Sequence, residues 1–75
     1  MELRIQVGEE MARVRKLKKL TQAELAQAVG VSQRTIAAIE GGTRRPSPEL
    51  AQRIGAVLGF PWTRFYEDEE ESEEG

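Results

Sequence analysis

The stretch that decides the fold is residues 20–46, LTQAELAQAVGVSQRTIAAIEGGTRRP. Thr21 and Glu24 have the spacing of a capping box, in which each side chain bonds the other residue's backbone N–H at a helix start. Ser32 supplies a second helix start, and Gly30 before it suits the left-handed residue that ends the first helix. The stretch therefore predicts two short helices joined by a tight turn and followed by a basic segment.

Helices of about two turns are not stable by themselves, so this pair needs packing partners. Residues 9–18 are predicted as a first helix whose inner face carries Met11, Val14 and Leu17. Residues 1–8 alternate apolar and polar side chains with a period of two. They are predicted as an arm that feeds the first helix, and a strand that pairs with its copy in a dimer is the alternative.

The residues after the motif complete the domain. Ser47 has the character of a helix cap, a stripe of apolar residues follows it at helical spacing, and Gly59 is placed to end that helix. Residues 60–66, FPWTRFY, contain all four aromatic residues of the chain. Aromatic residues at this spacing are expected in the core, whereas Trp62 and Tyr66 could instead lie in a dimer interface.

The composition excludes several classes of protein. Seventy-five residues allow one domain. The chain has neither cysteine nor histidine, so it lacks disulfides, a thiol nucleophile, the usual zinc ligands and the usual general base. No apolar run is long enough for a membrane span or a signal peptide. We therefore expect a cytoplasmic protein that is not an enzyme, has no membrane association, and holds no cofactor or metal.

The formal net charge of −2 conceals an asymmetry. Residues 67–75, EDEEESEEG, contain seven acidic residues and no basic one, which leaves eleven basic and six acidic residues, a charge of +5, in residues 1–66. A basic body favours a polyanionic partner such as nucleic acid. The acidic tail is predicted to be disordered because it has too little apolar surface to bury. It either serves solubility alone or competes with DNA for the basic face.

Taken in register, the motif resembles the Cro and phage-repressor (XRE-type) helix-turn-helix family. The matching residues are Arg15, Leu20, Thr21, Gln22, Leu25, Ala26, Gly30, Val31, Ser32, Ile36, Glu40, Gly42 and Pro46. The resemblance implies an all-α, lambda-repressor-like bundle of about five short helices, with the DNA-binding domain over residues 9–66. It also implies an ion pair between Arg15 and Glu40. Lys19 departs from the family, which usually has glycine at this left-handed position.

The helix that starts at Ser32 is the one expected to enter the major groove of double-stranded DNA. At 100° per residue its buried side carries isoleucines, and the opposite side carries the candidate base-contacting residues, which are Gln33, Arg34, Ala37 and Ala38. Glutamine pairs with adenine, arginine with guanine, and alanine methyls meet thymine methyls. The candidate backbone-contacting residues are Gln22, Ser32, Thr43, Arg44 and Arg45.

These features favour a sequence-specific DNA-binding transcriptional regulator, interpreted as a repressor that binds a palindromic operator as a homodimer. The alternative is an antitoxin or protein-interaction module of a toxin–antitoxin pair, which would have a protein partner. An enzyme is the weakest hypothesis. The glutamates at 69–71 form a charge run rather than an oriented pair, and Gly41-Gly42 lacks the strand–helix context of a phosphate-binding loop.

Overall fold

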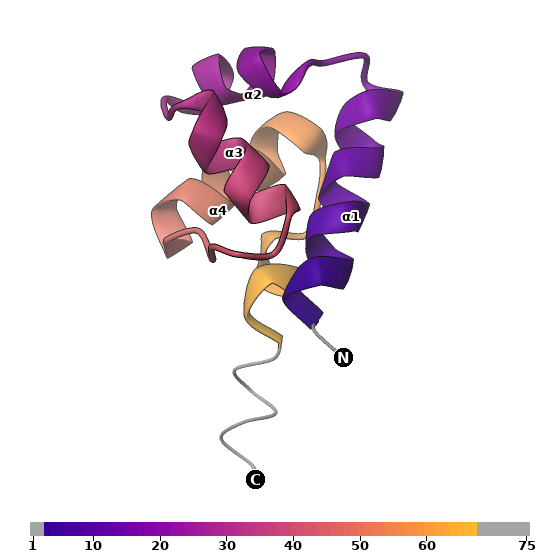
Figure 1. Cartoon of the computed structure of the whole chain (residues 1–75), viewed down its shortest axis with the longest axis vertical. Helices are drawn as coiled ribbons and strands as arrows, with labels where there is room; N and C mark the ends of the chain where they lie inside the picture. The colour runs from indigo at the N-terminus through magenta and orange to yellow at the C-terminus, as the bar shows by residue number, and fades with distance from the viewer. Residues whose placement is uncertain (1–2, 68–75) are drawn as a thin grey trace, which may run out of the picture.

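The computed structural model describes residues 3–67 (Figure 1). These residues form four α-helices and a 3-10 helix, with no strand among them: α1 (Leu3–Leu17), α2 (Gln22–Val29), α3 (Gln33–Glu40), α4 (Pro48–Leu58) and η1 (Trp62–Tyr66). The predicted all-α bundle is confirmed, with a 3-10 helix as its fifth element.

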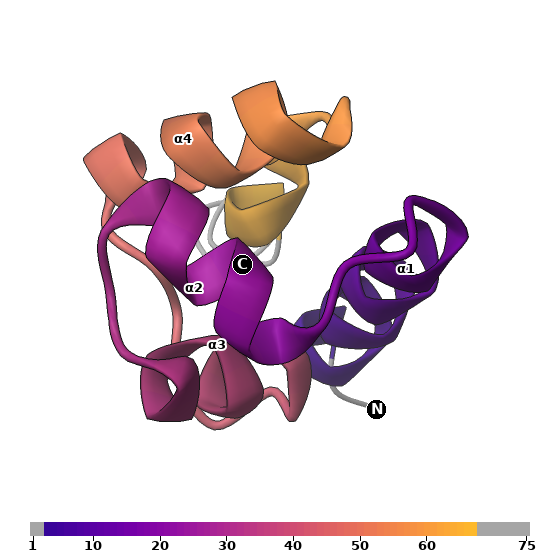
Figure 2. The same ribbon diagram turned by 90° about the horizontal axis from the view of Figure 1, so that it is seen from above.

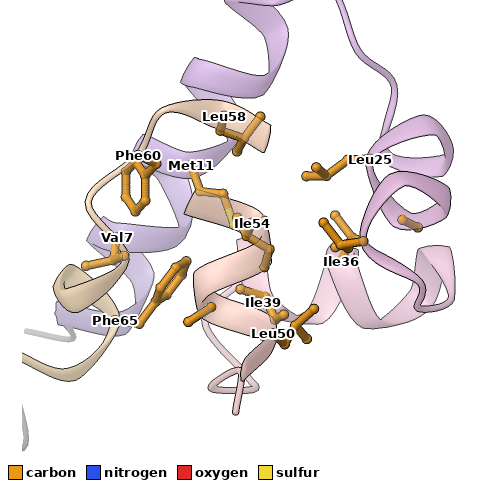
Figure 3. Close-up of a cluster of buried hydrophobic side chains, with 13 residues drawn as sticks. Val7, Met11, Leu25, Ile36, Ile39, Leu50, Ile54, Leu58, Phe60 and Phe65 are labelled. Carbon is orange, nitrogen blue, oxygen red and sulfur yellow. The ribbon is translucent and has the colours of Figure 1, made fainter. Parts of the chain in front are cut away.

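All five elements share one apolar core. Helix α2 packs against α3 and α4, α1 packs mainly against α3, and η1 closes the bundle against α4 and α1 (Figure 2). The core side chains labelled in Figure 3, each no more than 7% exposed, are Val7, Met11, Leu25, Ile36, Ile39, Leu50, Ile54, Leu58, Phe60 and Phe65. Because every helix contributes to this core, the short α2 and α3 are stabilised by tertiary packing rather than by their own length.

The predicted helix ends of the motif are present. The Thr21 hydroxyl accepts the Glu24 N–H at 3.0 Å, and the Glu24 carboxylate accepts the Thr21 N–H at 2.9 Å. Gly30 ends α2 with φ 82°, and the Ser32 hydroxyl accepts the Thr35 N–H at 3.1 Å to cap α3. These local bonds satisfy backbone groups that would otherwise lack partners, and they define the turn between α2 and α3.

The predicted arm over residues 1–8 is wrong for the part of it that the structure describes. Helix α1 begins at Leu3 rather than at residue 9, and Val7 is part of the core. Val7 and Met11 lie four residues apart on one helical face, and both are buried against the rest of the bundle. This burial stabilises a helix more than the local period of two favours an extended arm.

Leu17 was expected on the inner face of the first helix, and this expectation is also wrong. Its side chain is 74% exposed. Leu17 is the last residue of α1. At 100° per residue, it lies about 90° around the helix from the stripe formed by Val7, Met11 and Val14. Lys19 follows with φ 62°, so the chain keeps the left-handed turn despite the unfavourable residue type.

The C-terminal end of the described chain is held against α1. Arg64 donates to both carboxylate oxygens of Glu10, with Nε 3.2 Å and Nη2 2.5 Å away, and its Nη1 donates to Glu67 at 2.6 Å. The hydrogen bonds to Glu10, and to a smaller extent the one to Glu67, raise the pKa of Arg64 above its ordinary value. Glu67 is thus a bonded part of the domain, whereas the rest of the predicted tail, residues 68–75, lies outside the described residues.

Gly8 allows α1 and α3 to approach closely. A Cβ atom on Gly8 would overlap the backbone carbonyl oxygen of Glu40 and would lie 2.7 Å from that of Ile39. Neither atom can move without shifting the end of α3. Glycine at this position therefore sets the distance between the two helices.

We expect Gly8→Ala to lower the free energy of unfolding by about 1–2 kcal/mol, because overpacking against backbone atoms costs up to about 3 kcal/mol and the gain in helix propensity is only about 1 kcal/mol. Urea denaturation measures the change. Gly59→Ala is the matched control, because its Cβ would meet nothing within 4 Å and only the φ of 69° is unfavourable. A Gly8→Ala protein as stable as the wild type would contradict the close approach.

Candidate nucleic-acid interface

Helix α3 divides sharply into a buried and an exposed face. Ile36 and Ile39 are fully enclosed by the core. Gln33, Arg34 and Ala37 are exposed, and Ala38 is half-buried. The isoleucines direct this helix onto the bundle because they recur at its period. The predicted base-contacting residues thus share the outer face of α3, and this helix lies at the front of the molecule in Figure 1.

The Ser32 hydroxyl, at the start of α3, remains available to bond a group outside the chain. The Ser32 hydroxyl accepts the Thr35 N–H and lies 3.0 Å from the Thr35 hydroxyl. When the Thr35 hydroxyl is the donor of this pair, Ser32 keeps its own proton for an outside acceptor. Ser32 can therefore cap the helix and still donate to a phosphate oxygen.

The end of α3 is joined to α1 by a buried ion pair. Arg15 Nε donates to Glu40 Oε2 at 2.7 Å, and Arg15 Nη2 donates to Glu40 Oε1 at 3.3 Å. The side chains are only 9% and 8% exposed. Arg15 Nη1 also donates to the Leu20 carbonyl at 2.8 Å, which holds the turn before α2. The pair implied by the resemblance is thus a bidentate contact between helices that are distant in sequence.

Gln22 takes part in the same network, which the sequence did not indicate. Its Nε2 atom donates to Glu40 Oε1 at 2.9 Å, so α1, α2 and α3 all meet at one carboxylate. Gln22 was predicted to contact a phosphate from the first turn of α2. Its amide nitrogen carries two protons, so one remains for a phosphate while the other bonds Glu40. No local pattern links these residues, because they are 18 positions apart.

The loop between α3 and α4 carries the predicted basic segment. The Thr43 N–H and hydroxyl donate to the Ala38 carbonyl at 3.0 and 3.2 Å, which closes the end of α3. Arg44 is exposed and Arg45 is half-buried. Because the Thr43 hydroxyl already donates within the chain, Thr43 shapes the loop and has no second proton for a phosphate.

The first turn of α1 packs against this loop. The prediction of an arm over residues 1–8 did not include this contact. Gly42 has φ 83°, and a Cβ atom there would lie 2.7 Å from Cγ1 of Ile5. Glycine therefore serves both the left-handed turn and the close approach to α1. The loop that bears Arg44 and Arg45 is thus built on α1 as well as on α3.

Most of the exposed positive charge lies in two regions, and Arg4 of α1 and Arg53 of α4 are exposed outside them. One surrounds α3 and its following loop, with Arg34 and Arg44. The other is at the C-terminal end of α1 and comprises Arg13, Lys16, Lys18 and Lys19, all exposed. Residues 3–67 contain eleven basic and six acidic residues, a charge of +5. Such a surface attracts the phosphate backbone and does so less strongly as salt rises.

Residues 3–67 contain no group of three or more His, Cys, Asp or Glu side chains placed to hold a metal ion. None of their helices has the length and apolar character needed to cross a bilayer.

Comparison with known proteins identifies similar chains. A family model described as helix-turn-helix matches residues 11–65. The Bacillus subtilis protein YqaF, described as an uncharacterized HTH-type transcriptional regulator, is 45% identical over 51 residues. These residues cover 68% of this chain and 67% of the YqaF chain. A protein of Methanocaldococcus jannaschii with the same description is 45% identical over 58 residues, 75% of this chain and 88% of its own. One of Methanothermobacter thermautotrophicus is 55% identical over 40 residues, 53% of this chain and 58% of its own.

The ion pair generates a double-mutant prediction. Arg15→Met leaves the Glu40 carboxylate buried without its cation, and Glu40→Leu leaves the guanidinium without its anion, so each should lower the free energy of unfolding by about 3–5 kcal/mol. The double variant buries no charge at this position and should be more stable than either single variant. Chemical denaturation of the four proteins measures the coupling energy. Losses that simply add would show that the two side chains do not act as a pair.

Proposed function

Since the chain belongs to the XRE-type helix-turn-helix family of DNA-binding transcriptional regulators, we propose that it is a repressor that binds a palindromic operator as a homodimer. The observation that supports this function best is the outer face of α3. Gln33 and Arg34 stand exposed at the start of a helix whose opposite side is anchored in the core. The N-terminal residues of a recognition helix are the ones that reach base edges.

In this proposal the two long side chains read the sequence. Gln33 bonds N6 and N7 of an adenine, and Arg34 bonds O6 and N7 of a guanine. Ala37 and Ala38 have no polar reach, so they let the helix sit close to the groove and contact thymine methyl groups. Specificity is then concentrated in the first turn of α3.

The backbone contacts position that turn. We assign phosphate contacts to Ser32, to the second amide proton of Gln22, and to Arg44 and Arg45. Thr43, also predicted in this set, contributes by closing the loop. These contacts provide affinity and orientation without reading bases. The protein acts by occupying DNA in the cytoplasm rather than by catalysis.

A dimer explains how so small a protein reaches high specificity. One α3 reads only a few base pairs, and two copies related by a two-fold axis read two half-sites about one helical turn apart. Dimerisation also adds buried surface to a chain of 75 residues, whose single core is small. The partly buried Trp62 and Tyr66, which pack at the edge of the core, are candidates for that interface.

Selection from a random pool of duplexes tests the function directly. We expect enriched sequences with two-fold symmetry and half-site centres about 10 base pairs apart, because the spacing of two recognition helices follows the pitch of DNA. Light scattering of the complex should give two chains per duplex. Enrichment of a single asymmetric half-site bound by one chain would rule out the dimer, and no enrichment at all would rule out sequence-specific binding.

Substitutions on α3 test the residue roles. Gln33→Ala and Arg34→Ala should each weaken binding to the selected operator by about 1–3 kcal/mol and change binding to random DNA far less. Fluorescence anisotropy at fixed salt measures both. Arg53→Ala is the matched control, because it removes an exposed cation from α4, where Arg53 contacts Glu49 and the Val29 carbonyl. Equal losses for Arg34→Ala and Arg53→Ala would show that only net charge matters.

A further inference from the structure

The end of the described chain lies beside the basic loop. The Tyr66 hydroxyl donates to the Pro46 carbonyl at 2.6 Å, which joins η1 to the residue that follows Arg45. In Figure 1 the connection between α3 and α4 runs just above η1. The Trp62 ring packs edge-on against Tyr66, with centroids 6.1 Å apart, and fixes the ring that makes this bond.

The same end is fixed on its other side. Arg64 ties η1 to Glu10 of α1 and also bonds Glu67. The Glu67 carboxylate is therefore already matched by a cation within η1. Six further acidic residues and no basic residue follow in residues 68–75.

We propose that the acidic segment 68–75 binds the basic loop 43–46 of its own chain and occupies the place of a DNA phosphate. Carboxylates and phosphates make the same charge-assisted bonds with guanidinium groups, so one loop can accept either. Eight residues span up to about 26–29 Å, which easily covers the loop beside which the segment starts. A tether this short gives an effective concentration in the millimolar range.

The other basic region is the competing location. Lys16 lies six residues beyond Glu10 in α1, about 9 Å farther along the helix axis from the point where Arg64 anchors η1. Arg13, in the same region, lies three residues beyond Glu10, about 4.5 Å along the axis. The loop is bonded to η1 through Tyr66 and carries two adjacent arginines, whereas three of the four cations at the end of α1 are lysines, which match carboxylates less well. The segment can reach both regions, and the pair of arginines favours the loop.

The consequence for DNA rests on the proposed function, whereas the binding of the segment to the loop does not. If DNA must displace the segment, operator and random DNA lose affinity by the same factor. The specificity ratio is then unchanged, while occupancy of random sites falls. Two ion pairs, one to each arginine of the loop, predict a factor of about 3 to 30 at low salt.

Amide NMR spectra without DNA test the location. The comparison protein is a neutral-tail variant, in which Asp68→Asn and Glu→Gln at 69, 70, 71, 73 and 74 remove the six charges. At low salt, the shift differences from wild type should centre on residues 43–46, and they should vanish in 0.5 M salt. They should also be lost when Arg44→Gln and Arg45→Gln are added to both proteins.

Lys16→Gln with Lys19→Gln is the matched control and should leave these differences intact. Differences centred on residues 13–19, or none beyond residues 66–67, would overturn the proposal.

Binding to a random duplex tests the consequence. Neutralising the segment should tighten binding about 3- to 30-fold at low salt and little in 0.5 M salt, and the gain should shrink when Arg44→Gln and Arg45→Gln are present. A gain unaffected by those two substitutions would overturn competition at the loop. If the NMR differences appear but no duplex binds any variant, the segment binds the loop as proposed and it is the regulator function that fails.

Discussion

The arrangement of the domain depends on the carboxylate of Glu40. It receives two bonds from Arg15 of α1 and one from Gln22 of α2, while Arg15 also holds the Leu20 carbonyl. A buried ion pair of this kind adds little net stability compared with apolar residues, but an incomplete one is costly. Its contribution is therefore geometric. If α1 or α2 moved away from the end of α3, the buried carboxylate of Glu40 would lose hydrogen-bond partners. The end of α3 therefore has one favourable position.

Close packing makes that position rigid. Gly8 brings α1 against the carbonyl of Glu40, and Gly42 brings the following loop against Ile5. The same few residues therefore support both the end of α3 and the basic loop. A regulator that reads bases with one turn of helix needs such support, because small displacements of Gln33 or Arg34 would break the paired hydrogen bonds with bases that we propose for them.

Charge is distributed in a way that the whole-chain value of −2 hides. The described domain is basic, and the excess negative charge is concentrated after Tyr66. Since Tyr66 is bonded to Pro46, the structure brings the start of that acidic segment to the loop that we assign to phosphates. The same arginines would then attract DNA and bind the acidic segment that weakens this attraction.

The sequence by itself determined the capped ends of α2, α3 and α4 and the two faces of α3, because capping residues and apolar periodicity act within one or two turns. Thr21, Ser32 and Gly30 are examples of such local signals. Only the tertiary structure decided that α1 starts at Leu3 and that Gln22 bonds Glu40. Those features depend on burial and on partners far away in the chain, for which no local pattern exists.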